Sequence, residues 1–236
     1  MIGTFLVLAT ILVLGIPAAV IFIPLAALTG KVRPLYDVTC FITRTAFRAA
    51  GIRFVTEGAE HVPAGQACII MANHVSNLDP PALIPRIPGY TSGFSKRSVF
   101  KLPVFGYCLK LGEFIPLDRK GNKESAQQSI AAAKRLLDKG LHITTFVEGT
   151  RSRDGRLLPF KKGPFYLAEA TGAPCIPVSI YGTETLMAKG SFGIKGGTAH
   201  IVFHPPIRPG DYATREELML AVRASIASGL PEWMRG

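Results

Sequence analysis

Hydrophobic residues run almost without interruption at the start of the chain, and no charged residue occurs between Met1 and Gly30. A bilayer core needs roughly 20 apolar residues, which this run supplies. The run lacks the basic beginning of a signal peptide and is too long for one, so we expect it to be retained. Pro17 and Pro24 each remove a helix donor. The pattern predicts a helical membrane anchor, either a kinked span or a hairpin that dips into one leaflet.

An amphipathic helix is predicted over Tyr36–Ala50, soon after the anchor. Five residues share its less polar face: Val38, Phe41, Ile42, Thr45 and Ala46. Arg44 and Arg48 lie elsewhere on it at i,i+4 spacing. Such a helix either lies in a membrane interface or packs as the first helix on a domain core. With the anchor it forms a first region, residues 1–50.

Strands and helices alternate over residues 51–236, which we interpret as one domain. Short runs rich in β-branched residues predict six strands: Ile52–Thr56, Ala67–Ala72, Phe114–Leu117, Leu141–Val147, Pro174–Ile180 and Thr198–His204. Helical patterns cover Lys123–Lys139, Pro164–Thr171 and Thr214–Ser228. The alternation predicts an α/β fold with a mixed, partly parallel sheet flanked by helices. In such folds ligands gather where strands end.

The chain is strongly basic, with a formal net charge of +11. Between Lys96 and Lys162, fifteen Lys or Arg residues stand against six Asp or Glu. Nucleic acid, an anionic membrane surface and a phosphorylated substrate all attract such a charge. The chain has neither a nucleic-acid-binding motif nor interleaved aromatic residues. Beside an apolar anchor, the excess therefore favours anionic membrane lipids or a phosphorylated substrate. Basic residues directly after the anchor place the domain on the cytoplasmic side.

The four cysteines are far apart in the sequence and form no CxxC pair. This usage fits a reduced compartment and indicates no metal site. Each cysteine is better interpreted as a small buried apolar residue than as a nucleophile.

The strongest local signal is the segment Asn73–Asp79, which follows a predicted strand. His74 and Asp79 are five residues apart, about 140° on an ideal helix, so a turn pairs them better than a helix does. We expect a helix to start near Pro80 with Asp79 as its N-cap. One carboxylate oxygen then caps the helix and the other accepts the imidazole N–H. That bond leaves the second ring nitrogen free to take a proton from a hydroxyl. The alternative is a loop histidine that only stabilises the turn.

Two further blocks, Phe146–Ser152 and Gly112–Arg119, bring polar residues to strand ends. The candidates in them are Arg119, Glu148, Gly149, Thr150 and Arg151. Gly149 permits a tight turn, and Arg151 can bind phosphate with two parallel hydrogen bonds. The alternatives are a structural Glu148–Arg151 ion pair and a solvated turn at Arg119.

In order and content these segments resemble the motifs of the glycerolipid acyltransferases, specifically the bacterial 1-acylglycerol-3-phosphate O-acyltransferases. Asn73–Asp79 resembles the NHxSxxD block, Gly112–Arg119 the block that ends in Asp-Arg, and Phe146–Ser152 the FxEGTRS block. Ile176–Ile180 resembles the proline-bearing strand of the fourth motif, and Phe160–Gly163 the FKxG stretch. The likeness covers roughly residues 55–206, most of the domain.

The resemblance implies an acyltransferase domain over residues 51–236. It implies that His74 is the general base, oriented by Asp79, for attack of the sn-2 hydroxyl of a lysophospholipid, 1-acylglycerol 3-phosphate, on a thioester. The residues that it places around the acceptor are Arg119, Glu148, Gly149, Thr150 and Arg151. The donor is acyl-CoA or acyl-carrier protein, a co-substrate, and neither a metal nor a bound cofactor is implied.

Several alternatives stay open. The acceptor could be glycerol 3-phosphate or another lysolipid, because the motif chemistry is shared. A lipid hydrolase usually needs a nucleophile, and no GxSxG occurs; a non-catalytic lipid-binding protein has no need of a poised base. Four apolar residues fit an acyl groove and a core equally well: Phe100, Leu102, Val104 and Phe105.

Overall fold

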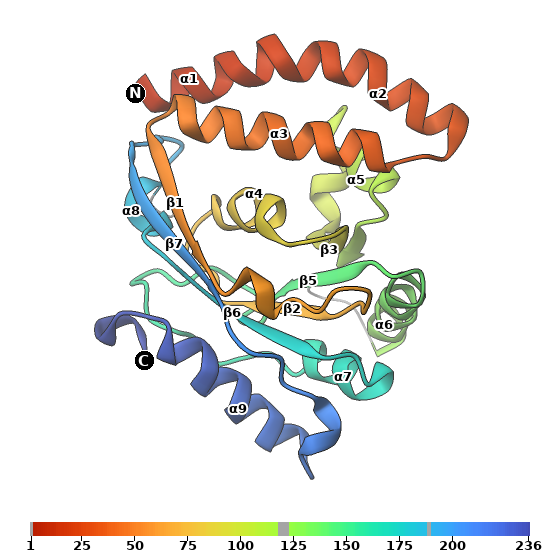
Figure 1. The fold of residues 1–236 in the computed structure, drawn as a ribbon, viewed down its shortest axis with the longest axis vertical. Helices are drawn as coiled ribbons and strands as arrows, with labels where there is room; N and C mark the ends of the chain where they lie inside the picture. The colour runs from red at the N-terminus through yellow and green to blue at the C-terminus, as the bar shows by residue number, and fades with distance from the viewer. Residues whose placement is uncertain (1, 118–122, 188–189) are drawn as a thin grey trace.

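The computed structural model describes residues 2–117, 123–187 and 190–236, and at its centre lies one seven-stranded sheet (Figure 1). In chain order the strands are β1 (Ile52–Glu57), β2 (Ile69–Ala72), β3 (Thr91–Lys96), β4 (Ile115–Leu117), β5 (His142–Phe146), β6 (Cys175–Tyr181) and β7 (Gly197–Phe203). In space their order is β1-β7-β6-β2-β5-β3-β4. Neighbouring strands are parallel except β6 and β7, which are antiparallel. The predicted α/β fold with a mixed sheet is confirmed.

Helices cover both faces of this sheet. Those before β4 are α1 (Ile2–Thr10), α2 (Ile16–Thr29), α3 (Arg33–Ala49), α4 (Asp79–Leu83) and α5 (Phe105–Leu111). Those after it are α6 (Lys123–Asp138), α7 (Gly163–Thr171), α8 (Thr183–Leu186) and α9 (Arg215–Ser228). Shorter helical turns are η1 (Ile11–Gly15), η2 (Ala59–His61), η3 (Ile84–Arg86), η4 (Arg97–Lys101), η5 (Pro209–Asp211) and η6 (Glu232–Met234).

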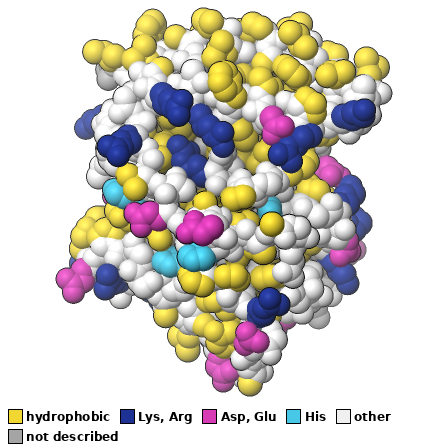
Figure 2. Space-filling model, viewed as in Figure 1, with side chains coloured by type: hydrophobic (Ala, Val, Ile, Leu, Met, Phe, Trp, Pro, Cys, Tyr) yellow, Lys and Arg dark blue, Asp and Glu magenta, His cyan; other side chains and the backbone are white. Residues whose placement is uncertain are grey.

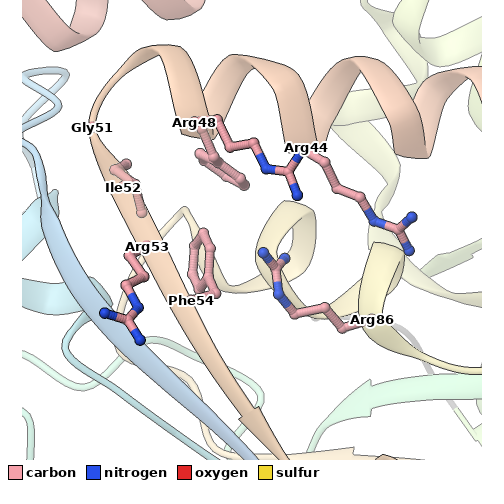
Figure 3. Close-up of a pocket in the computed structure, with 8 residues that line it drawn as sticks. Arg44, Arg48, Gly51, Ile52, Arg53, Phe54 and Arg86 are labelled. Carbon is pink, nitrogen blue, oxygen red and sulfur yellow. The ribbon is translucent and has the colours of Figure 1, made fainter.

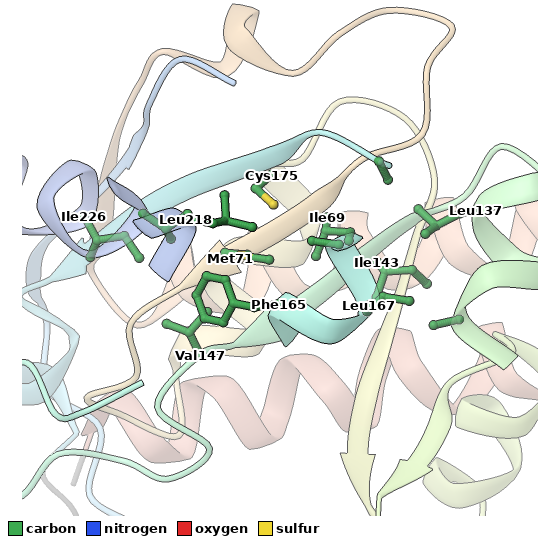
Figure 4. Close-up of a cluster of buried hydrophobic side chains, with 14 of the residues drawn as sticks. Ile69, Met71, Leu137, Ile143, Val147, Phe165, Leu167, Cys175, Leu218 and Ile226 are labelled. Atoms are coloured by element: carbon green, nitrogen blue, oxygen red, sulfur yellow. The ribbon is translucent and has the colours of Figure 1, made fainter. Parts of the chain in front are cut away.

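The sheet separates two apolar cores, because successive side chains of a strand point to opposite faces. In β2, Ile69 and Met71 pack with side chains of α6, α7 and α9 (Figure 4). Ile70 and Ala72 pack on the other face, under α3 and α4. Because β2 is buried on both faces, its sequence is a continuous apolar run rather than an alternating one. The segment that follows β2 therefore begins from a rigid centre.

The N-terminal apolar segment is one helical rod, α1–η1–α2, which lies along α3 (Figure 1). At 28 residues, Ile2–Thr29 is long and apolar enough to cross a membrane. The π-helical turn η1 ends at Gly15, two residues before Pro17, and its wider turn relieves the clash between the proline ring and an earlier carbonyl. Neither Pro17 nor Pro24 reverses the chain; the reversal comes at Gly30, whose φ is +68°.

Helix α3 packs on the domain core, which is one of the two interpretations of its amphipathic pattern. Ala46 and Phe47 are buried against the domain, whereas Phe41 is 61% exposed on another face. Hydrophobic side chains also lie along the edge formed by α1 and α2 (Figure 2). On the rod, Phe5 and Val20 are each 69% exposed and Leu28 is 86% exposed. Exposed apolar side chains gathered along one edge are typical of a surface that contacts a membrane or another protein.

All six predicted strands are present, each within two residues of its predicted bounds. The predicted helices are present as well, although α3 begins three residues earlier than predicted. Strand β3 was missed because its buried residues, Thr91, Ser92 and Gly93, carry no hydrophobic signal. The apolar residues between Phe100 and Phe105, which fit either an acyl groove or a core in the sequence, form neither a buried core nor an enclosed groove. Leu102, Val104 and Phe105 are each more than half exposed.

Candidate active site

The central feature of the site is a hydrogen bond between His74 and Asp79. Strand β2 ends at Ala72, and the loop that follows brings Nδ1 of His74 to 2.7 Å from Oδ2 of Asp79. A carboxylate only accepts hydrogen bonds, so Nδ1 carries the hydrogen and donates it. Nε2 then keeps its lone pair and is available to take a proton. The His74 side chain is 15% exposed and the Asp79 side chain is fully buried, so a substrate can reach the ring but not the carboxylate.

Asp79 is held by both of its carboxylate oxygens. Oδ2 also accepts the backbone N–H groups of Val75 at 2.7 Å and Ser76 at 2.8 Å. Oδ1 accepts the hydroxyl of Thr183 at 2.5 Å. Together with the imidazole, four donors surround a carboxylate that has no solvent exposure, which offsets the cost of burying it. The carboxylate cannot rotate away from His74 without breaking several of these bonds.

This arrangement corrects one detail of the predicted turn. Asp79 was expected as an N-cap, with one oxygen capping the helix. Instead Leu78 is the N-cap, Asp79 is the first helical residue, and no side-chain cap bond is made. The reason is that the loop before α4 wraps around Oδ2, which accepts from that loop and from the ring together. The pairing of His74 with Asp79 across a turn was predicted correctly.

The His74 loop is clamped to its neighbours by side-chain and backbone hydrogen bonds. Asn73 donates from Nδ2 to the carbonyl of Ile180 at 2.9 Å and accepts that residue's N–H at Oδ1 at 2.7 Å. Ser76 donates its hydroxyl to the carbonyl of Met187 at 2.8 Å. The His74 ring stacks on Phe146, with ring centroids 4.3 Å apart. The proline-bearing strand β6 thus positions the His74 loop.

The block after β5 lies directly beside His74. Ser152 donates its N–H to the carbonyl of His74 at 2.8 Å, and His74 donates its own N–H to Oε1 of Glu148 at 3.3 Å. Gly149, with φ +66°, makes the turn between them. Thr150 is exposed and Arg151 is partly buried on this turn. The structure therefore places the turn between Glu148 and Ser152 beside His74; Arg119 lies outside the described residues.

Glu148 is almost completely buried, with 1% of its surface exposed. Burial raises the pKa of its carboxyl to about 8, with the charge of Asp79 adding to the effect. Hydrogen bonds from the backbone of His74 and Leu158 lower the pKa, but they do not overcome burial. At neutral pH this carboxyl therefore holds its proton, so it adds little negative charge near an anionic substrate.

The sequence did not reveal the residues after β6 that support the His74–Asp79 pair. Thr183, which bonds Asp79, is 104 residues away in the chain. Glu184 follows it, and burial with the nearby charge of Asp79 raises the pKa of its carboxyl. The available sequence signal was Gly182, a turn residue after a predicted strand, whose φ is +88°. It marks a turn but does not reveal which loop the turn meets.

The family model described as Acyltransferase matches residues 53–181. That match includes more than half of the chain, together with the His74 loop and the Glu148 block, so the chain belongs to the acyltransferase family.

Individual relatives agree with this family assignment. A chloroplastic 1-acyl-sn-glycerol-3-phosphate acyltransferase of Brassica napus is 35% identical over 165 residues, which are 69% of this chain and 46% of the relative. The human 1-acyl-sn-glycerol-3-phosphate acyltransferase alpha is 28% identical over 189 residues, 80% of this chain and 67% of that protein. The chain thus spans about half the length of the plant relatives that it matches.

A solved structure resembles this one over nearly its whole length. The crystal structure of the 1-acyl-sn-glycerophosphate acyltransferase of Thermotoga maritima superposes with a TM-score of 0.81 at 25% sequence identity. The match covers 98% of this chain and 95% of the other. The likeness therefore includes the N-terminal helices as well as the sheet.

Proposed function

We propose that the protein transfers a fatty acyl chain from a thioester, acyl-CoA or acyl-carrier protein, to the sn-2 hydroxyl of 1-acylglycerol 3-phosphate. The product is phosphatidate. The observation that carries the proposal is the His74–Asp79 pair, in which Nδ1 is bonded and Nε2 is free to act as a base. The relatives named for this reaction support the choice of acceptor.

In the proposed mechanism, Nε2 of His74 removes the proton of the acceptor hydroxyl as its oxygen attacks the thioester carbonyl. Asp79 stabilises the imidazolium that forms, because its Oδ2 already bonds Nδ1. The tetrahedral intermediate collapses with loss of the C–S bond. The leaving thiolate takes the proton from His74, which restores the neutral ring and releases free thiol. Such proton transfer contributes about 10²- to 10⁴-fold to the rate.

The acceptor carries a phosphate, and the loop beside His74 offers groups to bind it. We assign that role to Arg151, with Gly149 and Thr150 lining the approach. For Arg119 the same role rests on the sequence resemblance alone. Glu148 is buried beneath this loop and bonds the backbone of His74, so its contribution to acceptor binding is through the loop. Because its carboxyl is protonated at neutral pH, it does not repel the phosphate.

We further propose that residues 1–50 hold the catalytic domain, residues 51–236, on the cytoplasmic face of a cell membrane rich in anionic lipids. The rod α1–η1–α2 lies along α3, and α3 carries Arg44 and Arg48. A rod that crossed the bilayer would draw these arginines into hydrocarbon, which is costly. Insertion in the plane of one leaflet keeps the rod apolar and the arginines near headgroups. The exposed apolar side chains of α5, which contacts α2, extend the same surface.

The test is the release of free thiol from oleoyl-CoA by the purified full chain, with and without lysophosphatidate. We expect release that depends on the acceptor and that falls by at least about 10²-fold in His74→Ala. The matched control is His61→Ala, which changes a histidine of η2 outside the site. Acceptor-independent release would indicate a hydrolase. No release from either CoA or carrier-protein donors, with any glycerolipid acceptor, would exclude the proposed activity and leave a lipid-binding role.

A further inference from the structure

A second cluster of basic side chains lies away from the catalytic loops, in a cavity of about 600 Å³ between α3, β1 and η3 (Figure 3). Four arginines line it: Arg44, Arg48, Arg53 and Arg86. Phe47 and Phe54 complete much of the wall, and none of the described lining residues is Asp or Glu. We call this cavity the arginine pocket. It contains no residue of the His74 loop or of the Glu148 block.

The protein holds these charges together although they repel one another. Arg86 stacks over the ring of Phe54, with its Cζ atom 4.0 Å from the ring centroid, and donates to the carbonyl of Ala82 at 2.6 Å. Arg44 donates to the carbonyl of Pro85. Burial and the positive charges of Arg44 and Arg48 lower the pKa of Arg86 to about 10. An anion in the pocket would relieve this repulsion.

The geometry suits a phosphate group. In Figure 3 the guanidinium groups of Arg48 and Arg86 point into the space beside Phe54, while Arg53 lies beyond Phe54 with its guanidinium directed away from them. Each guanidinium has five N–H donors, so the bonds to Ala82 and Pro85 leave others for a ligand. Planar guanidinium forks match the oxygen pairs of phosphate, and their weak hydration favours such contacts.

The position of the pocket in the fold indicates which kind of molecule carries that phosphate. Its wall on one side is α3, whose other side packs against the apolar rod α1–η1–α2. Lys and Arg side chains gather below the hydrophobic edge of the molecule in Figure 2. If the rod lies in a leaflet, the cavity is at the depth of the headgroups. We propose that the arginine pocket binds the phosphate of an anionic bilayer phospholipid, at a site separate from the acceptor site.

The experiment measures lipid binding without any acyl donor, so its outcome does not depend on turnover. The full chain in neutral-detergent micelles is titrated calorimetrically with short-chain phosphatidylglycerol, and Arg151→Ala is titrated in parallel to identify any binding at the acceptor site. We expect one saturable site, and no comparable binding of short-chain phosphatidylcholine. Arg48→Gln and Arg86→Gln should each weaken binding by at least about tenfold, since each removes charge-assisted hydrogen bonds.

The matched control is Lys31→Gln, which removes one positive charge near the same membrane-facing side but outside the pocket. Diffuse attraction alone predicts a loss of about fivefold for every such charge. Equal losses for Lys31→Gln and Arg48→Gln would therefore overturn the proposal. Arg48→Lys keeps the charge and removes the planar fork. Weaker lipid binding by this variant, with an unchanged unfolding temperature, supports the pocket because a folding defect does not explain it.

Two further titrations separate the possible sources of phosphate. Inorganic phosphate should compete only weakly, because it lacks the glycerol that the rest of the cavity can hold. Inorganic phosphate binding as tightly as phosphatidylglycerol, with the same dependence on Arg48, would contradict a lipid occupant. If CoA bound with the same dependence on Arg48 and phosphatidylglycerol did not bind, the pocket would instead belong to the acyl donor.

Discussion

Thr183 donates its hydroxyl to Oδ1 of Asp79 at 2.5 Å, and Asp79 uses its other oxygen to bond the ring of His74 at 2.7 Å. Thr183 stands at the start of α8, directly after the strand β6 and its turn. The orientation of the proposed base therefore depends on a residue from a distant part of the chain. Thr183 touches the carboxylate and not the ring, so we class it as a positioning residue.

Thr183→Val should lower kcat by about tenfold, because a buried hydrogen bond to a charged group is worth roughly 1.5–3 kcal/mol. Neither Michaelis constant should change much, since the hydroxyl meets no substrate. Thr183→Ser should restore most of the rate. The control is Thr185→Val, which removes an exposed hydroxyl of the same helix that bonds the carbonyl of Gly182. A raised Michaelis constant with unchanged kcat would mean that Thr183 shapes the binding site instead.

Glu148→Gln should change the pH dependence of stability. The pKa of Glu148 is raised from 4.5 to about 8, so over that interval the folded chain holds a proton that the unfolded chain releases. The wild-type free energy of unfolding therefore falls as pH rises through the interval, by up to about 1.4 kcal/mol per pH unit. Gln cannot titrate, so the advantage of the variant should grow from the lower to the upper end.

Chemical unfolding in neutral detergent, compared near the two ends of that interval, measures this difference. Glu60→Gln, at an exposed carboxyl of η2, should show no comparable trend. If the Glu148 variant and the wild type lose stability in parallel as pH rises, then the Glu148 carboxyl is already ionised at neutral pH.

Arg151→Ala should raise the Michaelis constant for lysophosphatidate by about tenfold or more, because a charge-assisted pair with phosphate is lost. The Michaelis constant for the acyl donor should change much less. Steady-state kinetics with each substrate varied in turn gives both constants. Arg153→Ala is the control, since it removes an exposed arginine two residues further along the same loop. Equal effects of Arg151→Ala on both constants would show that its assigned role is wrong.

The exposed face of the N-terminal rod should govern membrane attachment. Val20→Lys and Leu28→Lys place charges on side chains that are 69% and 86% exposed, and each charge in hydrocarbon costs about 2.5–3.5 kcal/mol. The fraction of the double variant that sediments with membranes should fall. Leu220→Lys, at a residue of α9 that is 66% exposed, should leave that fraction unchanged. Unchanged sedimentation of the double variant would transfer the anchoring role to the basic surface.

Much of the sheet was predictable because its strands carry strong local signals. The runs Ile69–Ala72 and Cys175–Tyr181 are apolar and rich in branched residues, and both are central strands. Strand β3 shows the limit of that signal. Thr91 satisfies its buried hydroxyl by bonding Thr144 at 2.8 Å, and Ser92 donates to the carbonyl of Glu113 at 2.9 Å. In the sequence, such buried polar residues cannot be told from the polar residues of a surface loop, because their hydrogen-bond partners are known only from the structure.

The candidate site likewise has one part that the sequence predicted and one part that it did not. The pairing of His74 with Asp79 was predictable because both residues belong to one short turn, whose geometry depends on local spacing. The bond from Thr183 was not, because it requires the end of β6 to lie beside the His74 loop. That neighbourhood follows from the position of β6 next to β2 in the sheet, which depends on long-range packing.

The sequence by itself determined the apolar N-terminal helix, the alternating α/β pattern, and the loops that bear His74, Glu148 and Arg151. Each of these is written in a local run of residue types, where burial or turn geometry limits the choice. Only the tertiary structure decided that the rod lies along α3, and that arginines from α3, β1 and η3 line one cavity. Such groupings join residues far apart in the chain. They depend on the order of strands and the packing of helices, which no local pattern specifies.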